Sequence, residues 1–311
     1  MLKSYLLALV LLIASPWLAA KPATPAPPLP LLWQACGSDN CLYLLGSFHV
    51  LRADDYPLSV DVEAAFARAS SVVFEIAPDE LVSAELAGKM MAAAAQRGGR
   101  QLHDDLSPAL NAKFDAWADQ HQAALTEQGV AAPMFQLFKP WFAAIMVSLT
   151  SMQTIDMHAE HGLDRYLAQR ALAAGKAVAG LESGDAQIAM LDGMQRDEQL
   201  QMLEEALDSA AAGSQHIIAL HAAWRRGDAD RLLEDSVNSM RDDYPRLYRV
   251  INVDRNRAWL PQLEARLQQP GRERSLVVVG AMHLLGDDGL LAMLERAGYR
   301  IERICTACAG R

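Results

Sequence analysis

The sequence is poor in aromatic residues, in positive charge and in cysteine. Aromatic residues make up only 6% of the 311 residues whereas 51% are apolar, which favours Ala- and Leu-rich helices around a small sheet. The formal net charge is −10 at pH 7. A partner of nucleic acid or of an anionic membrane needs a basic face, so this charge argues against both kinds of partner.

The chain also lacks a hydrophobic run that is typical of a membrane-spanning helix. Residues 135–150 are nearly all apolar, but sixteen residues interrupted by Pro140 are too few to cross a bilayer. After a signal sequence is removed, we therefore expect no stable membrane insertion.

Residues 1–20 resemble a secretory signal. Lys3 provides a positive start, residues 6–13 form a short apolar core, and small residues allow cleavage near Ala20. A membrane anchor is the alternative. Because no cysteine lies near the cleavage site, we do not expect a lipoprotein anchor. Residues 21–30 contain five prolines and predict an extended tether. We expect a periplasmic or secreted protein whose remaining residues, 31–311, form one domain.

Four cysteines in an exported chain predict two disulfide bonds. Cys36 and Cys41 flank a four-residue loop between two strand-like segments, which places them opposite each other in a hairpin. Cys305 and Cys308 form a C-x-x-C pair near the end of the chain, which fits a short disulfide ring or a redox pair. A zinc site built from all four cysteines is a further alternative.

Short apolar runs bounded by turn residues predict the strands, and longer periodic stretches predict helices. The predicted strands cover residues 31–33, 42–45, 71–76, 177–182, 276–280 and 299–304. Helices are expected at 59–69, from Ser107, and at 135–150, 163–175, 196–224, 228–240, 244–268 and 287–297. The predicted fold is α/β (α+β), with a small mixed central sheet of four to six strands and large helical insertions at about 80–175 and 185–270.

A Gly-x-x-His motif closes an apolar strand near each end of the chain. Gly46 to His49 follows the strand at 42–45, and Gly280 to His283 follows the strand at 276–280. Each end therefore has the order strand, Gly-x-x-His, helix, strand. Because sites of open α/β sheets form at the carboxyl ends of strands, we expect the two strands to be close and the two imidazoles to converge.

Two carboxylates end or interrupt apolar strands in the same way. Glu75 lies within 71–76 and Glu182 closes 177–182, where an unpaired charge is costly. With His49 and His283 they form the ligand set of a divalent transition metal, although no H-E-x-x-H motif is present. The alternative is a set of hydrogen-bonded core histidines and of glutamates paired with arginines.

Several polar residues have two interpretations. Arg255, beside Asn256, is placed to hold a carboxylate or an oxyanion, or alternatively to pair at the surface with Asp254 or Glu264. His158 and His161 are further candidate metal ligands, but their polar surroundings predict exposure to solvent. Asp164 is interpreted as an acid in the first turn of a helix.

These motifs together resemble the TraB/GumN (PrgY) family. The resemblance is carried by Tyr43–His49, Val73–Glu75, Gly180–Ser183 with Gln187, Asp254–Asn256 and Val279–Gly286. The family is related to the Tiki metalloproteases and to erythromycin-esterase-like and ChaN-like proteins, and some members are implicated in disabling secreted peptide pheromones. The resemblance implies a site containing His49, Glu75 and His283, with Arg255 and Asn256 nearby. Ser47 stands where the family often has Thr, a conservative difference.

The sequence thus leads to three hypotheses. The first is an exported metal-dependent hydrolase, most simply a peptidase, with Mn, Co or Zn held by His49, His283 and Glu75 and with Glu75 or Glu182 as ligand or general base. The second is an esterase-like hydrolase without metal, in which a histidine is the base. The third is a non-catalytic accessory protein in envelope or exopolysaccharide assembly. The substrate, a peptide or a small molecule, and the oligomeric state are not specified by the sequence.

Overall fold

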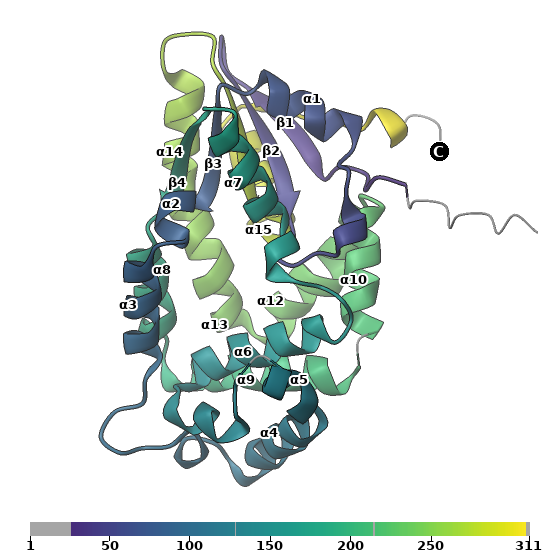
Figure 1. The fold of residues 1–311 in the computed structure, drawn as a ribbon. Helices are drawn as coiled ribbons and strands as arrows, with labels where there is room; N and C mark the ends of the chain where they lie inside the picture. The colour runs from purple at the N-terminus through teal and green to yellow at the C-terminus, as the bar shows by residue number, and fades with distance from the viewer. Residues whose placement is uncertain (1–25, 128, 214, 309–311) are drawn as a thin grey trace, which may run out of the picture.

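The computed structural model describes residues 26–127, 129–213 and 215–308 (Figure 1). The predicted signal at 1–20, with its cleavage site near Ala20, lies outside these residues. Within them, no helix combines the length and the apolar character needed to cross a membrane.

One six-stranded mixed sheet organises the chain, as the sequence predicted. Its order is β4-β3-β5-β2-β1-β6, in which β1 runs antiparallel to both of its neighbours. The strands are β1 (Leu32–Cys36), β2 (Cys41–Ser47), β3 (Ser71–Ile76), β4 (Ala177–Glu182), β5 (Arg274–Gly280) and β6 (Arg300–Arg303). This order confirms the predicted α/β class, and it makes the two ends of the sequence neighbours in space.

The strands that carry the two Gly-x-x-His motifs pair directly. β2 and β5 are parallel, with Ser47 opposite Gly280, and β5 also pairs with β3 on its other side. β4 extends the parallel part beyond β3. The carboxyl ends of β2, β5, β3 and β4 therefore share one edge of the sheet, where α/β folds usually build their sites.

The hairpin of β1 and β2 is closed by a disulfide bond. Cys36 and Cys41 are register partners at the end of the hairpin next to its loop, with a Cα–Cα distance of 4.1 Å. Cys305 and Cys308 form the second disulfide after β6. Both predicted pairs are confirmed, so no cysteine among the described residues is left for a zinc site.

Helices cover both faces of the sheet, which explains why β2, β3 and β5 are buried along nearly their whole length. Figure 1 shows α7 (Leu163–Ala173) in front of the sheet, near α1 (Val60–Arg68), and α14 (Asp254–Gln268) behind it. α16 (Leu290–Arg296) packs beside α14. Strand side chains and helix side chains such as Trp259 share one core.

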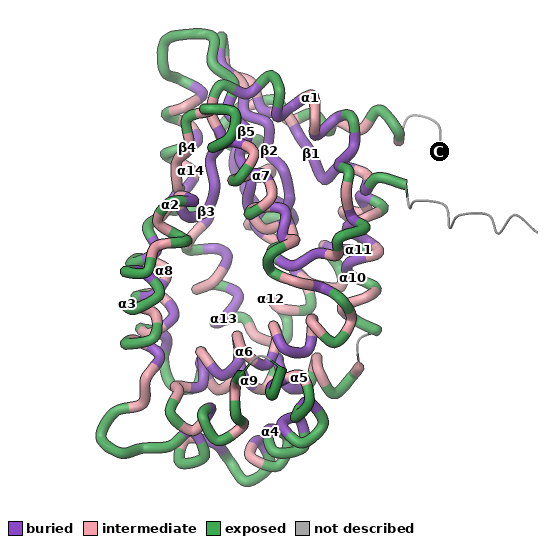
Figure 2. Tube along the Cα trace, viewed as in Figure 1, coloured by how far each residue is buried: buried purple, intermediate pink, exposed green. Residues whose placement is uncertain are grey.

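A second group of helices packs beyond the carboxyl edge of the sheet, and exposure is greatest on its outer side (Figure 2). It comprises α4 (Pro108–Gln120), α5 (Gln122–Glu127), α6 (Pro140–Gln153) and α9 (Arg196–Ala211), around a core that includes Phe114 and Phe135. A smaller cluster around Trp141 and Leu247 links this group to the helices near the sheet.

The remaining helices are short. They are α2 (Pro78–Leu81), α3 (Ala84–Ala94), α8 (Gly184–Gly193), α10 (Gln215–Arg225), α11 (Ala229–Leu232), α12 (Ser239–Asp243), α13 (Pro245–Tyr248) and α15 (Ala281–Leu284). The 3-10 segments are η1 (Ala53–Asp55), η2 (Leu102–Asp104), η3 (Ala132–Leu137), η4 (Ala159–His161) and η7 (Thr306–Cys308). The segments η5 (Leu233–Asn238) and η6 (Arg249–Val253) are π-helical.

Four predicted helices differ from the structure for local reasons. The helix expected at 135–150 begins at Pro140, because proline suits the first helical position, and a 3-10 segment precedes it. The helix expected at 196–224 is two helices, since Gly213 adopts a left-handed φ of 76° that ends α9. The helix expected at 244–268 contains the π-helical η6 between α13 and α14, and the helix expected at 228–240 contains the π-helical η5 between α11 and α12.

Candidate functional site

His49 lies in a bend two residues beyond β2, with a side chain that is 63% exposed. Its Nδ1 donates to Asp164 Oδ2 at 2.8 Å, and the other oxygen of Asp164 accepts from Ser47 Oγ at 2.9 Å. Gly162 allows this close approach, because a Cβ there would lie 2.1 Å from the carbonyl oxygen of His49. A carboxylate only accepts hydrogen bonds, so Nε2 is the nitrogen of His49 that faces the site.

His283 lies on the short helix α15 directly after β5 and is buried. Its Nδ1 is 2.8 Å from Asn256 Oδ1. The amide nitrogen of Asn256 donates to the carbonyls of His283 and Asp288, which leaves Oδ1 as the acceptor for Nδ1–H. Nε2 is therefore again the nitrogen turned toward the site.

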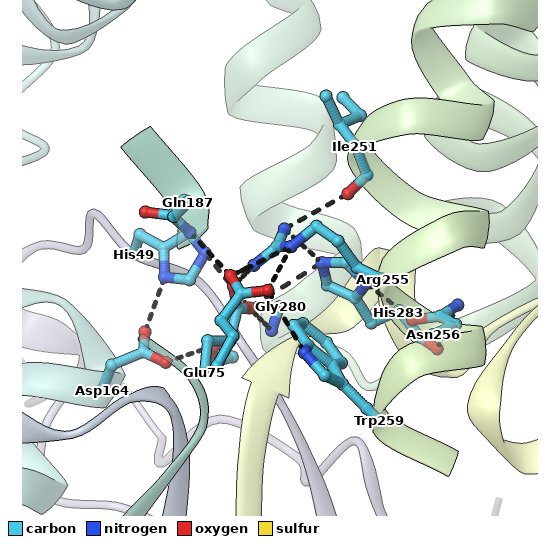
Figure 3. Close-up of polar contacts among 12 residues, drawn as sticks. His49, Glu75, Asp164, Gln187, Ile251, Arg255, Asn256, Trp259, Gly280 and His283 are labelled. Atoms are coloured by element: carbon cyan, nitrogen blue, oxygen red, sulfur yellow. Dashed lines mark hydrogen bonds and ion pairs between the residues drawn. The ribbon is translucent and has the colours of Figure 1, made fainter. Parts of the chain in front are cut away.

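Glu75 is the buried carboxylate between the two imidazoles (Figure 3). Its Oε1 accepts the backbone N–H of Gly280 at 2.8 Å. The same oxygen is 3.7 Å from His49 Nε2 and 3.9 Å from His283 Nε2, so the two nitrogens are less than 8 Å apart. The structure thus brings both Gly-x-x-His motifs and the carboxylate of β3 to one point.

Arg255, near the start of α14, supplies the positive charge of the cluster. Its Nη2 donates to Glu75 Oε2 at 2.5 Å, and its Nη1 lies 3.1 Å from His283 Nε2. The alternative partners, Asp254 and Glu264, are wrong for this arginine, because the guanidinium turns inward to the carboxylates of β3 and β4.

Glu182 receives more donors than any other carboxylate of the site. Arg255 Nη2 donates to it at 2.7 Å, Arg255 Nε lies 3.1 and 3.2 Å from its two oxygens, and Trp259 Nε1 and Gln187 Nε2 each donate at 3.2 Å. These hydrogen bonds join Glu182 to Arg255, Trp259 and Gln187. The centre of the Trp259 ring lies 4.6 Å from the Arg255 guanidinium and 4.6 Å from the centre of the His283 ring.

The two histidines have opposite protonation preferences. The negative charge of Asp164, and to a lesser degree that of Glu75, raises the pKa of His49 to about 9. Water that reaches the exposed ring weakens this effect. Burial lowers the pKa of His283 to about 3, helped by the charge of Arg255. At neutral pH, His283 is therefore a neutral acceptor at Nε2.

Glu75 stays ionised although it is buried. Burial alone would raise its pKa, but the neighbouring positive charges and the N–H of Gly280 hold the pKa well below its usual range. Because His283 is neutral at pH 7, the positive partners that keep this carboxylate charged are Arg255 and protonated His49.

The site residues expected from sequence are thus found at one edge of the sheet. His49, Glu75, His283, Arg255, Asn256 and Glu182 form a continuous network. The catalytic and metal-binding roles assigned to them remain predictions. His158 and His161 are partly exposed and contact each other, and His158 pairs with Asp156 and not with a residue of this network.

Asp164 is the residue that sequence reasoning undervalued. It does lie in the first turn of α7, as expected, but it also fixes the ring of His49 from 115 residues away. The sequence signal that was available is Gly162-Leu163-Asp164, where a glycine precedes an acid at a helix start.

Comparison with known proteins identifies the family of the chain. The model of the TraB/PrgY/gumN family matches residues 31–303. The chain is 30% identical over 169 residues to the uncharacterized protein YbaP of Escherichia coli (strain K12) and equally to that of Shigella flexneri. These matches cover 54% of this chain and 61% of the relatives' length. No solved structure matches the chain.

The family match extends over nearly all described residues and includes every residue of the network at the sheet edge. It agrees with the resemblance carried by the paired Gly-x-x-His motifs. The chain belongs to the TraB/PrgY/gumN family.

Proposed function

We propose that this protein is an exported hydrolase that cleaves a peptide at the cluster of His49, Glu75 and His283, with a divalent transition metal as its cofactor. The observation that carries the proposal is the shared orientation of the imidazoles. Both direct Nε2 toward one oxygen of Glu75, and an acceptor on a different element holds each Nδ1. Metal-binding histidines typically have such acceptors behind them, because these fix the ring and its tautomer.

The spacing and the charge of these residues fit a divalent ion. Two ligands of one ion lie about 3–4 Å apart when each bond is near 2.0–2.2 Å, and Glu75 Oε1 is 3.7 and 3.9 Å from the two nitrogens. A histidine binds metal through the lone pair of Nε2, so His49 must lose the proton that its raised pKa retains at neutral pH; three carboxylates (Glu75, Glu182 and Asp164) and one guanidinium then leave two formal negative charges. A divalent cation neutralises this charge.

One contact does not fit. In the described residues, no three His, Cys, Asp or Glu side chains are arranged to hold a metal ion. The Arg255 guanidinium instead contacts both Glu75 and His283. The donor types therefore match those of a metal site, whereas their arrangement around Arg255 does not.

When bound, Mn, Co or Zn would lower the pKa of water and polarise the scissile carbonyl. The residues of the chain then have separate tasks. Asp164 and Asn256 keep the two imidazoles in their orientation, and Glu75 lies beside them as a ligand or as an acceptor for the proton of the attacking water. Arg255 offers N–H donors to the oxyanion that develops on the carbonyl, where fixed donors contribute most.

The contact between Arg255 and His283 favours a second candidate, hydrolysis without a metal. Here His49, held by Asp164, exchanges a proton with water or with the leaving group, and Arg255 stabilises the oxyanion. The raised pKa of His49 then makes it a proton donor near neutral pH.

Two features support export. The Cys36–Cys41 and Cys305–Cys308 disulfides are compatible with an oxidising compartment outside the cytoplasm. Residues 1–20 have the pattern of a signal sequence. We infer a periplasmic or secreted location, which N-terminal sequencing of the purified protein tests by locating the cut near Ala20.

The deciding experiment compares metal content and hydrolysis in one set of proteins. Elemental analysis and mass spectrometry of a peptide library are applied to the wild type, to His49→Ala and to His103→Ala. His103 is a matched control, since it is partly exposed and paired with Asp115 at 3.2 Å in a different part of the chain. We expect about one metal equivalent and cleavage in the wild type and in the control, and loss of both in His49→Ala.

Other outcomes separate the hypotheses. Cleavage by a wild type that contains no metal supports the second candidate, and cleavage that survives His49→Ala contradicts both hydrolase proposals. A binding activity that persists without either histidine, and without any cleavage, identifies the non-catalytic accessory protein.

A further inference from the structure

The last residues of the predicted Pro-rich tether lie against the fold. The N–H of Leu29 donates to the carbonyl of Arg225 at 2.7 Å, and Arg225 Nη2 donates to the carbonyl of Ala26 at 2.8 Å. Pro30 is buried. Residues 26–31, which we call the N-terminal strap, therefore run beside the end of α10 (Figure 1).

Both backbone groups of Gly46 are held, one by the N-terminal strap and the other by α10. The N–H of Gly46 donates to the carbonyl of Leu31, the last residue of the strap, at 2.8 Å. Its carbonyl oxygen accepts from Trp224 Nε1, on α10, at 3.1 Å. Leu31 and Trp224 are buried, so water does not compete for these two hydrogen bonds. Gly46 is the glycine of the first Gly-x-x-His motif, so the strap and α10 meet where the turn to His49 begins.

Trp224 also contacts the other end of this turn. Its ring packs against that of Phe48, with 5.6 Å between the ring centroids. The carbonyl of Phe48 accepts from the N–H of Leu163 at 3.0 Å, and Leu163 directly precedes Asp164. Asp164 in turn binds His49 Nδ1. One tryptophan therefore touches the first and the third residue of the motif, and the third is bonded to the start of the helix that orients the fourth.

A buried carboxylate connects the N-terminal strap to the segment that follows His49. Asp55 is fully buried and accepts from Arg225 Nη1 and from His221 Nε2, the latter at 2.8 Å. The ring of His221 is stacked with that of Trp224. Because Arg225 binds Asp55 and the strap at once, the docking of the strap and the position of α10 depend on each other.

The second Gly-x-x-His motif is held differently. The N–H of Gly280 donates to Glu75 within the site, and His283 lies on the helix α15. His49 lies in a bend instead, and its side chain is largely exposed. The first motif therefore depends more than the second on the elements packed around it.

We propose that the N-terminal strap is a positioning element for the first Gly-x-x-His motif, and that Trp224 and Arg225 are the positioning residues through which its docking acts on His49. The turn from Gly46 to His49 has the geometry of the site while the strap is docked, and it becomes mobile when the strap is lost. A proteolytic cut that removes the strap therefore misplaces His49 without touching any residue of the network at the sheet edge. This inference concerns the turn itself and goes beyond the proposed function, because it holds for each candidate chemistry.

The test is amide hydrogen exchange of the full mature protein, measured by NMR. Trp224→Phe retains an aromatic ring and removes the donor to Gly46. We expect the amides of Gly46 and Leu163 to exchange about tenfold faster than in the wild type, because the loss of a hydrogen bond lowers the free energy of local opening. The amide of Cys41, which is bonded at the opposite end of β2, is the reference within the same molecule and should exchange as in the wild type.

A second variant acts on the N-terminal strap without changing α10 or the site. Leu29→Pro removes the N–H that donates to Arg225, and it suits a segment that is already rich in proline. It should raise the exchange rates of the Gly46 and Leu163 amides at least about twofold, the effect of a weak net hydrogen bond. Pro27→Ala is the matched control, because Pro27 is exposed, and it should leave both rates unchanged.

Faster exchange that is confined to Gly46 and Leu163 supports the proposal. An equal rise at Cys41 shows a general loss of stability and overturns the positioning role. Unchanged exchange in Leu29→Pro, or an equal response of Pro27→Ala, overturns the role of the strap.

These measurements involve no substrate, so they separate the inference from the proposed function. In the cleavage assay, Trp224→Phe should lower kcat by about tenfold and keep the KM of the wild type, because the turn orients His49 and does not bind the peptide. Faster exchange at the turn, without cleavage by the wild type, supports the strap and rejects the hydrolase. Normal kcat in a Trp224→Phe protein whose turn exchanges faster rejects the positioning of His49 and leaves the hydrolase intact.

Discussion

The glycines of the two Gly-x-x-His motifs should respond in opposite ways to the same substitution. A Cβ on Gly280 would lie 3.4 Å from Glu75 Oε1, 3.4 Å from His49 Nε2 and 3.6 Å from His283 Cδ2. These are ordinary contacts, and Gly280 has a φ of −49°, which alanine adopts without strain. The added methyl group therefore fits, but it fills the space among the three side chains that are proposed to bind metal and water.

A Cβ on Gly46 would instead press on the core. It would lie 3.2 Å from Ala281 Cα, 3.2 Å from Leu31 Cβ and 3.3 Å from Ala281 Cβ, so backbone must shift to make room. Overpacking of this kind costs about 1–3 kcal/mol. Replacing glycine where the conformation suits alanine is otherwise neutral or stabilising by about 0.4–1 kcal/mol, which is the expectation for Gly280→Ala.

Urea denaturation followed by circular dichroism measures the free energy of unfolding of each variant. Metal titration and peptide cleavage measure the effect on the proposed site. We expect Gly280→Ala to keep the stability of the wild type. Its metal affinity and its rate of cleavage should fall at least tenfold, because the methyl group fills the space among Glu75, His49 and His283. Gly46→Ala should lose stability and keep its metal affinity under folding conditions. A Gly280→Ala protein that binds metal and cleaves peptide normally would refute the placement of the reaction among His49, Glu75 and His283.

Two further predictions concern carboxylates that are bonded to a histidine. Asp164→Asn should move the pKa of His49 from about 9 back toward the ordinary 6.5, because Asp164 is the main cause of the shift, and NMR titration of the imidazole measures this without any substrate. The same variant should bind metal about 10- to 100-fold more weakly, because it weakens the acceptor behind a ligand. The exposed Asp156→Asn is the control, and its His49 pKa and its metal affinity should equal those of the wild type. Asp55→Ala should destabilise the fold by about 3 kcal/mol, because Asp55 is fully buried and bonded to His221 at 2.8 Å and to Arg225, and Asp54→Ala on the exposed side is its control. The pKa of Asp55 is lowered in the folded protein, because its bonds to His221, Arg52 and Arg225 outweigh the effect of burial. The stability gap should therefore be constant above about pH 5 and narrow as the pH falls below about 4, and a gap independent of pH would show that Asp55 contributes by packing alone.

The sheet and the main site residues were predictable because their signals are local. Apolar runs that end in glycine mark β2 and β5, and the carboxylate of Glu75 inside an apolar strand must find a partner. Once parallel strands are assumed, their carboxyl ends meet at one edge. The convergence of His49, Glu75 and His283 follows from these steps.

The partners that orient these residues were not predictable in the same way. An acid in the first turn of a helix, such as Asp164, is ordinary, and only the tertiary structure places it against His49. Arg255 had surface partners available in sequence, and its turn toward Glu75 and Glu182 depends on how α14 lies against the sheet. The π-helical turn of η6 also has no simple sequence signal, because its wider hydrogen bonding is a response to packing.

The strand order has a consequence for the timing of activity during synthesis. β5 is inserted between β2 and β3, although it is formed by residues 274–280, close to the end of the chain. Until those residues have been made, β2 and β3 have no shared neighbour and His49 has no His283 to face. Contacts between such distant segments form slowly, because a long loop must close first. A nascent or truncated polypeptide that ends before β5 therefore lacks the assembled site, which forms only in a late step of folding.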